Sequence, residues 1–297
     1  MNTTTLTKLI NKKYSKCFEF LSQTPTIFNI IKTKKMEFLI WKPTPIKIKS
    51  LSEPVKLVTN TSKAKKRDPF QYPSKDPLFI TKIDEDFSLL FNKFYLVPKH
   101  LVLVTNKFVH QNTPLDLAIF KPALRILKVN DGLAFFNHGR ESGMSQPHKH
   151  VQFLPLPLLD KYNLPIEGLI NKAGMKYKER QIFELPVAYK NAVCKLDRNT
   201  NTPEKLLLAY HSLLDHLKIR YQFDEEQTLS DQSYNWLCTQ NWMMIVPRSN
   251  SFLENGLGIN SIGYVGSYFL RSLEQAKIIK EYGPLNTLID LGLSKNL

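Results

Sequence analysis

Two histidines and a glutamine, each two residues apart, are the side chains of this sequence best suited to chemistry. His148, His150 and Gln152 come directly after a small polar loop that contains Gly143 and Ser145. The residues after the glutamine are apolar and end in a proline, which predicts a short strand. Alternate side chains of a strand share one face, so we expect these three to lie together at spacings of about 6 to 7 Å.

This trio contains the groups needed to attack a phosphorus atom and to hold its oxygens. Neutral imidazole has a free lone pair at about pH 7, and histidine can act as a covalent nucleophile. The glutamine supplies an amide donor, and the preceding loop supplies a hydroxyl group and backbone N–H groups. The pattern therefore favours transfer of a phosphorus-containing group, with a histidine as the nucleophile.

A metal site is the main alternative, because two histidines at this spacing are more often metal ligands or ordinary polar residues. Zinc would need a third and usually a fourth ligand. Cys17, Cys194 and Cys238 are scattered along the chain, and Glu141 lies before the loop. We therefore expect no metal centre.

The wider sequence resembles a known family. The string from Gly143 to Gln152 is similar to the signature of the diadenosine tetraphosphate phosphorylases (ATP adenylyltransferases) of the histidine-triad superfamily. The resemblance runs over roughly residues 36 to 275. Four further segments carry it: 90–105, 135–137, 242–249 and 260–266.

This resemblance implies the phosphorolysis of diadenosine tetraphosphate to ATP and ADP through an adenylyl-histidine intermediate. His150, in the middle of the triad, is then the nucleophile, and His148 orients the site or contacts phosphate. Gln152 stands where hydrolases of the superfamily usually carry a third histidine, and it would donate to the α-phosphate. The alternatives are a related nucleotidyl transfer, such as adenylyl sulfate phosphorolysis to ADP, and a non-catalytic nucleotide- or nucleic-acid-binding protein.

The resemblance also implies substrate-binding residues from both halves of the chain: Lys49, Asn92, Lys93, Asn137, Gly143, Met144, Ser145, Gln146, Gln152, Asn260, Ser261, Ile262, Ser267 and Arg271. The family commonly has methionine and lysine where this chain has Ser267 and Arg271, which leaves the nucleoside preference open. Lys47 and the lysines of the 63–66 cluster are alternatives to Lys49 as the N-terminal lysine that binds phosphate. Asn137 could equally cap a turn. No covalent cofactor is implied, although Mg²⁺ could accompany the polyphosphate.

Length and composition fit an ordinary globular enzyme. The chain has 297 residues, of which 42% are apolar and 23% charged. It contains no run of 18 or more apolar residues, so we expect no transmembrane helix. Its three cysteines form no Cys-x-x-Cys pair, which favours a reducing compartment. We therefore expect a cytoplasmic enzyme with nucleotide substrates, bound neither to a membrane nor to nucleic acid, and the oligomeric state is left open.

The positive charge is concentrated at the N-terminus. Residues 1–67 hold 15 Lys or Arg and three acids, whereas the remaining 230 residues hold 26 and 23. A basic arm that binds nucleic acid and a targeting segment are both alternatives. The apolar residues of 18–21 and 36–41 favour a third interpretation, in which this segment packs as part of the fold.

Alternating patterns and turn residues predict an α+β fold: a histidine-triad-like, mostly antiparallel sheet flanked by helices, with a C-terminal extension domain. The two domains are expected at residues 1–170 and 185–297. Helices are predicted to start at Thr113-Pro114 and at Thr202-Pro203, and one of about four turns is predicted after Gly266. Strands are predicted at these segments: 78–80, 88–97, 101–105, 133–137 and 242–247.

Overall fold

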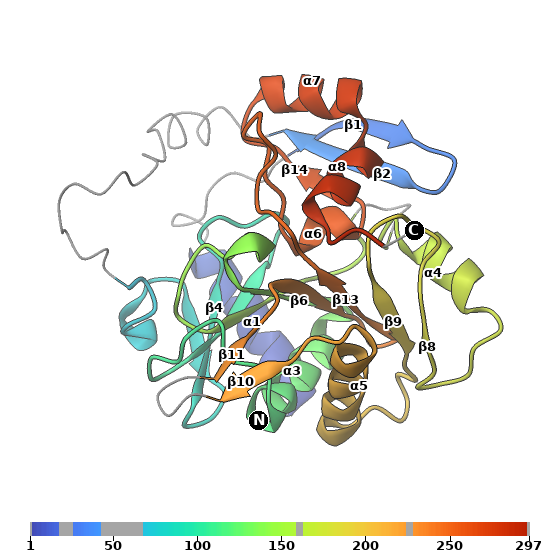
Figure 1. The fold of residues 1–297 in the computed structure, drawn as a ribbon. Helices are drawn as coiled ribbons and strands as arrows, with labels where there is room; N and C mark the ends of the chain where they lie inside the picture. Colours follow the sequence, from blue (N-terminus) through green and yellow to red (C-terminus); the bar gives the residue numbers. More distant parts are fainter. Residues whose placement is uncertain (1, 18–25, 43–67, 159–162, 224–227, 296–297) are drawn as a thin grey trace.

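The computed structural model describes residues 2–17, 26–42, 68–158, 163–223 and 228–295. At its centre lies an antiparallel sheet in the order β3-β4-β5-β7-β6-β12-β13-β9-β8 (Figure 1). These strands are β3 (Phe79–Lys82), β4 (Phe87–Phe91), β5 (Leu101–Thr105), β6 (Leu133–His138), β7 (His150–Leu154), β8 (Ile182–Phe183), β9 (Ala192–Lys195), β12 (Tyr234–Cys238) and β13 (Trp242–Pro247). The predicted α+β class, with mostly antiparallel strands, is confirmed.

Both halves of the chain build this one sheet. β6 pairs with β7 on one side and with β12 on the other, so the two halves are joined by backbone hydrogen bonds. Apolar residues from both halves also share one core beneath the sheet. The division into domains 1–170 and 185–297 stays a prediction, and the two segments meet at the β6–β12 pair.

Helices cover one face of the nine-stranded sheet. α1 (Thr3–Cys17), α3 (Leu117–Asn130) and α5 (Pro203–His216) pack in that order, each against the next (Figure 1). Leu6 and Ile10 of α1 are at most 2% exposed in the core that these helices form with the strands. The N-terminal helix is therefore an integral part of the fold, as the sequence favoured.

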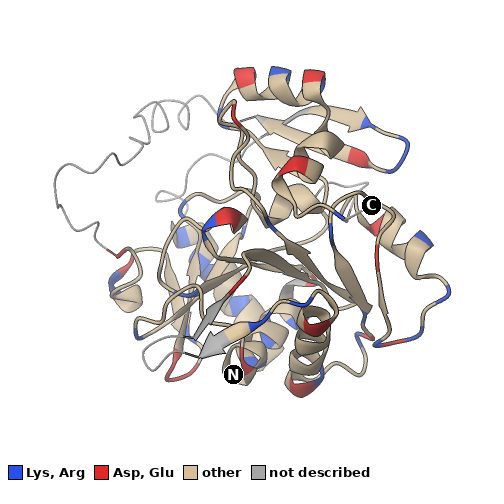
Figure 2. Ribbon diagram, viewed as in Figure 1, with Lys and Arg blue, Asp and Glu red and all other residues tan. Residues whose placement is uncertain are grey.

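The lysines of the N-terminal helix lie on the outer side of this helical layer. α1 and α3 together contain seven Lys or Arg and no Asp or Glu (Figure 2). Lys8, Lys12 and Lys16 are exposed, while the apolar residues between them face the core. This is the pattern of an amphipathic helix at a protein surface. No helix among the described residues is long and apolar enough to span a membrane.

A smaller sheet lies over part of the opposite face. It combines β1 (Thr26–Lys32) and β2 (Glu37–Lys42) from the N-terminus with β14 (Ser267–Phe269) near the C-terminus, and β14 runs parallel to β2. Four helices pack against this sheet or beside it: α4 (Glu167–Gly174), α6 (Ser261–Tyr264), α7 (Leu273–Tyr282) and α8 (Pro284–Leu291). A short pair of strands, β10 (Tyr221–Phe223) and β11 (Thr228–Ser230), completes the structure.

Most element boundaries follow local signals, but several differ from those expected. The strand expected at 88–97 ends at Phe91, and the residues from 92 to 97 form turns. Thr202 caps α5 by accepting a hydrogen bond from the Lys205 N–H, as predicted. The helix expected at Thr113-Pro114 instead begins at Leu117, because the Asp116 carboxylate accepts the Ile119 N–H and caps it.

The segment after Gly266 also differs from the prediction of one helix. Residues 267–269 form the strand β14, which pairs with β2, and α7 begins only at Leu273. Ser272 caps this helix by accepting the Gln275 N–H. The helical pattern in the sequence was correct from Leu273 onwards, but the pairing with a strand more than 200 residues earlier left no local signal.

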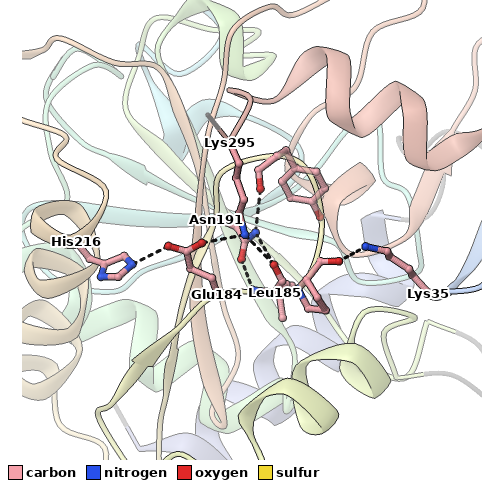
Figure 3. A network of polar contacts seen from close by, with 8 residues as sticks. Lys35, Glu184, Leu185, Asn191, His216 and Lys295 are labelled. Carbon is pink, nitrogen blue, oxygen red and sulfur yellow. Dashed lines mark hydrogen bonds and ion pairs between the residues drawn. The ribbon is translucent and has the colours of Figure 1, made fainter. Parts of the chain in front are cut away.

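Polar contacts secure the far edge of the molecule (Figure 3). The ammonium group of Lys295 donates to the Leu185 carbonyl at 3.0 Å and lies 2.9 Å from the Glu184 carboxylate. Glu184 also contacts the imidazole of His216 on α5 at 3.1 Å. On the other side, Lys35 of the β1–β2 turn donates to the Pro186 carbonyl. The segment after β8 is thereby joined to the C-terminal residues, to the helix α5 and to the small sheet.

Candidate active site

His150 begins the strand β7 and presents one ring nitrogen that has no partner in the described part of the chain. Its Nδ1 donates to the carbonyl oxygen of His148 at 2.8 Å, which leaves the lone pair on Nε2. No residue among those described accepts from or donates to that Nε2. The backbone of His150 is held by Gln111, whose Oε1 accepts from the His150 N–H at 2.7 Å and whose Nε2 donates to its carbonyl at 3.2 Å.

Burial sets the protonation state of this histidine. Burial lowers the pKa of His150, the bond to the His148 carbonyl opposes this shift, and the nearby His148 ring adds to it, so that the pKa is about 4. The imidazole is therefore neutral at about pH 7, where a histidine nucleophile must have its lone pair free.

His148 lies next to the nucleophile but is turned to other partners. Its Nδ1 lies 2.7 Å from the Asp68 carboxylate, and its Nε2 lies 2.8 Å from the carbonyl oxygen of Thr105. The ring of Phe70 covers both histidines, with centroids 5.9 Å from His148 and 5.3 Å from His150. Since both nitrogens of His148 are engaged, this geometry favours the orienting role over the phosphate contact. The strand itself begins two residues later than expected, at His150.

The amide of Gln152 is held in one orientation. Its Oε1 accepts from the Asn92 side-chain amide at 3.0 Å and lies 3.0 Å from Nε2 of His100. Nδ1 of His100 accepts the Leu96 N–H at 3.2 Å, so its Nε2 carries the proton and donates to Gln152. With its oxygen occupied in this way, the glutamine has its NH₂ group left as a donor, and the residue lines the cavity described next.

That cavity has a volume of about 420 Å³ and is lined by residues of both sheets. Trp41 and Phe269 of the small sheet stack with their centroids 5.1 Å apart and form part of its wall. Phe94 and Phe252 also line it and are more than half exposed. Eight of the predicted site residues line the cavity: Asn92, Asn137, Gly143, Ser145, Gln152, Asn260, Ser267 and Arg271.

Two segments far apart in the sequence meet beside this cavity. Oδ1 of Asn137 accepts the Ser261 hydroxyl at 2.6 Å and the Ser261 N–H at 3.2 Å. Gly143 has a φ of +83°, and a side chain there would place its Cβ 2.9 Å from the carbonyl oxygen of Ile259. The glycine loop and the 259–262 segment therefore touch, as the sequence anticipated.

The remaining predicted residues lie around this centre. Ser261 and Ile262 are buried, and Ile262 belongs to the core between the two sheets. Lys93 is exposed, with its ammonium group 5.8 Å from the ring centroid of Phe94. Met144 and Gln146 are half-buried within the glycine loop. Lys49, with its rivals Lys47 and the 63–66 cluster, lies outside the described residues.

Three residues that hold the site were missed from the sequence. Gln111 and His100 come from loops, and nothing in their spacing connects them with the triad. Arg248 follows the apolar strand β13 and is only 1% exposed. Its position directly after the continuous apolar run of β13 was a signal in the residue pattern that this arginine is buried. Among the described residues, no group of three or more His, Cys, Asp or Glu could hold a metal ion.

Comparisons with known proteins agree with this architecture. A solved structure of the yeast Ap4A phosphorylase Apa2 superposes with a TM-score of 0.78, covers 98% of both chains and is 24% identical. A complex of the same yeast enzyme with Ap4A superposes with a TM-score of 0.75. At these identities the structural likeness establishes the fold.

Sequence comparisons establish the family. The diadenosine 5',5'''-P1,P4-tetraphosphate phosphorylase 2 of Saccharomyces cerevisiae is 29% identical over 244 residues, which cover 74% of each chain. Protein APA1 of the same yeast is 30% identical over 233 residues and covers 72% of each chain. Residues 1–172 match the Ap4A phosphorylase N-terminal domain, and residues 185–294 match the ATP adenylyltransferase C-terminal domain. This chain belongs to the Ap4A phosphorylase (ATP adenylyltransferase) family.

Proposed function

We propose that this protein cleaves diadenosine tetraphosphate with inorganic phosphate to give ATP and ADP. The observation that carries the proposal is the neutral His150, whose Nε2 lone pair is open while its Nδ1 is bound to the His148 carbonyl. Gln152 lines the cavity and has its Oε1 bound by Asn92 and His100, which leaves its NH₂ group as the donor for a substrate. The yeast relatives support the substrate, because a curated relative is named for this phosphorolysis and a solved structure of a yeast Ap4A phosphorylase contains Ap4A.

In the first step, the Nε2 lone pair of His150 forms a bond to the α-phosphorus. The bond from that phosphorus to its bridging oxygen breaks, and ATP leaves with the electron pair. A polyphosphate is stable as an anion at neutral pH, so the step requires little help from a general acid. Positioning and charge neutralisation then make the main contributions to the rate.

In the second step, an oxygen of inorganic phosphate attacks the same phosphorus. The phosphorus–nitrogen bond breaks, His150 recovers its electron pair, and AMP departs joined to the phosphate as ADP. Two displacements through an adenylyl-histidine predict ping-pong kinetics. Phosphate carries its own negative charge and needs little assistance from a base.

The other predicted residues serve these two steps. Gln152 donates to the α-phosphate and remains bound to the intermediate, and His148 orients the carbonyl that holds His150. Ser145 and the 143–146 loop hold the polyphosphate, as a preorganised electrostatic site does. Lys93 and Arg271 contribute positive charge at its rim. A divalent cation such as Mg²⁺ would arrive with the polyphosphate, and the cytoplasm would supply both nucleotides and phosphate.

The test is a product assay with purified protein and diadenosine tetraphosphate, with and without inorganic phosphate. We expect equal amounts of ATP and ADP when phosphate is present and very little product when it is absent. If the protein without phosphate releases AMP as fast as it forms ADP with phosphate, it is a hydrolase and the proposal is overturned.

A further inference from the structure

Arg248 is the most completely buried cation of the described chain, and it binds backbone carbonyl groups from three separate segments. Its Nη1 donates to the Ser142 carbonyl at 3.3 Å. Its Nη2 donates to the carbonyls of Asn250 at 2.8 Å and Ile259 at 3.2 Å. Its Nε donates to the Leu291 carbonyl at 2.9 Å. One guanidinium group therefore joins the glycine loop, the 249–260 loop and the end of α8.

No carboxylate among the described residues lies within ion-pair distance of this guanidinium. Its side-chain partners are neutral: the amide of Asn235, whose Oδ1 accepts from Nη1 at 2.7 Å, and the ring of Tyr264, whose centroid lies 5.2 Å from the guanidinium carbon. Glu141 acts on it only from beyond ion-pair distance, and the Glu141 carboxylate is bound by the Ser233 hydroxyl. A buried charge without a counter-ion is costly, so a compensating anion is expected nearby in the functional state.

The carbonyl partners place Arg248 directly behind the wall of the cavity. Ile259 itself lines the cavity, Ser142 precedes the lining residue Gly143, and Asn250 precedes the lining residue Ser251. A positive charge at this position acts on the cavity through one layer of backbone, where water does not screen it.

The same contacts determine where two backbone N–H groups point. In a trans peptide, the carbonyl of one residue and the N–H of the next point in opposite directions. The carbonyls of Asn250 and Ile259 point at Arg248, so the N–H groups of Ser251 and Asn260 point away from it, on the side where both residues line the cavity. Neither N–H donates to another described residue.

We infer that Arg248 is a positioning residue for the phosphate chain of the substrate. It draws carbonyls inward and thereby turns the N–H groups of Ser251 and Asn260 into the cavity as donors to phosphate oxygens, and its own charge favours the anion there. Successive N–H groups directed into a concave surface are a known way to bind anions. The inference rests on the proposed function only in taking a nucleoside polyphosphate as the ligand.

The test compares the binding of ATP and of adenosine to the full-length protein by isothermal titration calorimetry. We expect Arg248→Met to lower the affinity for ATP by roughly tenfold or more, the effect of losing one or two charge-assisted hydrogen bonds, and to leave adenosine binding unchanged. Arg248→Lys keeps the charge but cannot bind carbonyls of three segments, so it should lose ATP affinity to a similar degree. Equal losses for ATP and adenosine, or full ATP affinity in either variant, would overturn the inference.

A second variant removes one donor and leaves the buried arginine in place. Ser251→Pro deletes the Ser251 N–H in a surface loop and should weaken ATP binding without changing adenosine binding. Glu254→Pro, at an exposed position of the same loop away from the cavity, is the matched control and should bind both ligands like the wild type. If Arg248 variants do not fold, unchanged ATP binding by Ser251→Pro contradicts the inference by itself.

The outcome is separable from that of the proposed reaction. Wild-type protein that binds ATP but forms no ADP from diadenosine tetraphosphate would overturn the reaction and leave the role of Arg248 to be decided by the binding data. If the wild type forms ATP and ADP but the Arg248 variants bind ATP like the wild type, the proposed reaction stands and the role of Arg248 is overturned.

Discussion

The two faces of β7 have opposite characters, although they alternate along five residues. Val151 and Phe153 point towards the helices and are at most 1% exposed in an apolar core. His150 and Gln152 point to the other face, where both contact polar groups and Gln152 lines the cavity. Because the side-chain period of a strand is two, one short segment can serve stability with one face and chemistry with the other.

The chemical face is itself divided by the small sheet. Leu154 and Phe135 lie on the same face as Gln152, but they are fully buried in the core between the two sheets. Two residues along each strand from these positions, Gln152 and Asn137 line the cavity. The edge of the small sheet therefore decides which residues of this face are packed and which can meet a substrate.

The largest expected effect is on the chemical face. His150→Ala removes the nucleophile and should lower kcat by about 10⁶-fold, as the loss of a catalytic nucleophile does elsewhere. Mass spectrometry of the wild type, incubated with substrate but without phosphate, should show an added AMP on His150. A variant that loses only a few fold would mean that another group attacks phosphorus.

Phe153→Ala tests the helical face of the same strand. It creates a cavity in the apolar core and should lower the free energy of unfolding by about 3–5 kcal/mol, measured by urea denaturation. Below its unfolding transition, the variant should keep the wild-type KM, because the side chain points away from the substrate. A changed KM with unchanged stability would break the division of roles between the two faces.

In our interpretation, Gln152 makes the enzyme transfer the adenylyl group to phosphate and not to water. A histidine at this position could act as a base towards water, so Gln152→His should raise the ratio of AMP to ADP by about 10²-fold at constant phosphate. Gln152→Ala should slow both reactions, since it removes the donor. An unchanged ratio in an active Gln152→His enzyme would leave the choice of acceptor to the phosphate site around Ser145.

His100 should matter because its Nε2 holds the amide of Gln152. His100→Gln places an amide NH₂ near the position of Nε2 and should keep most activity. His100→Asn is too short to reach it and should lower kcat/KM by about 10- to 100-fold, the effect of one lost buried hydrogen bond. Equal activity of the two variants would show that Gln152 is oriented without this contact.

The smallest effect is expected at the far edge, at Glu184. Its ion pair with Lys295, and then its contact with His216, hold the pKa of Glu184 below its usual value, although burial opposes the shift (Figure 3). The pair therefore stabilises the fold above the unfolded pKa of about 4.3, and this contribution is lost as the pH falls through the lower folded value. Because Glu184 is 45% exposed, Glu184→Gln should cost less than about 1 kcal/mol at neutral pH. The difference from wild type in denaturant unfolding should vanish in acid, and a difference that persists there would reject the ion pair as its cause.

Local patterns were sufficient for much of the fold. The proline after Thr202 and the cap that precedes it placed the start of α5, and the apolar run of 242–247 placed β13. The β14 strand was missed because three residues of a strand have too little periodicity to be told from a helix start. Its formation depends on β2, which lies at the other end of the chain.

The sequence by itself determined the chemical groups. His148, His150 and Gln152 stand two residues apart, a spacing that is local and follows from the covalent geometry of an extended chain. The Asn260–Ile262 segment was identified by its resemblance to the family. These features hold whatever the rest of the chain does.

The tertiary structure decided what each of those groups can do. It engaged both nitrogens of His148 and left Nε2 of His150 open, and it used His100 and Arg248, which are 50 and 98 residues from the nucleophile, to hold the amide and the loops. Hydrogen-bond partners and burial depend on which segments pack together in space, and the spacing of residues along the chain carries no record of that.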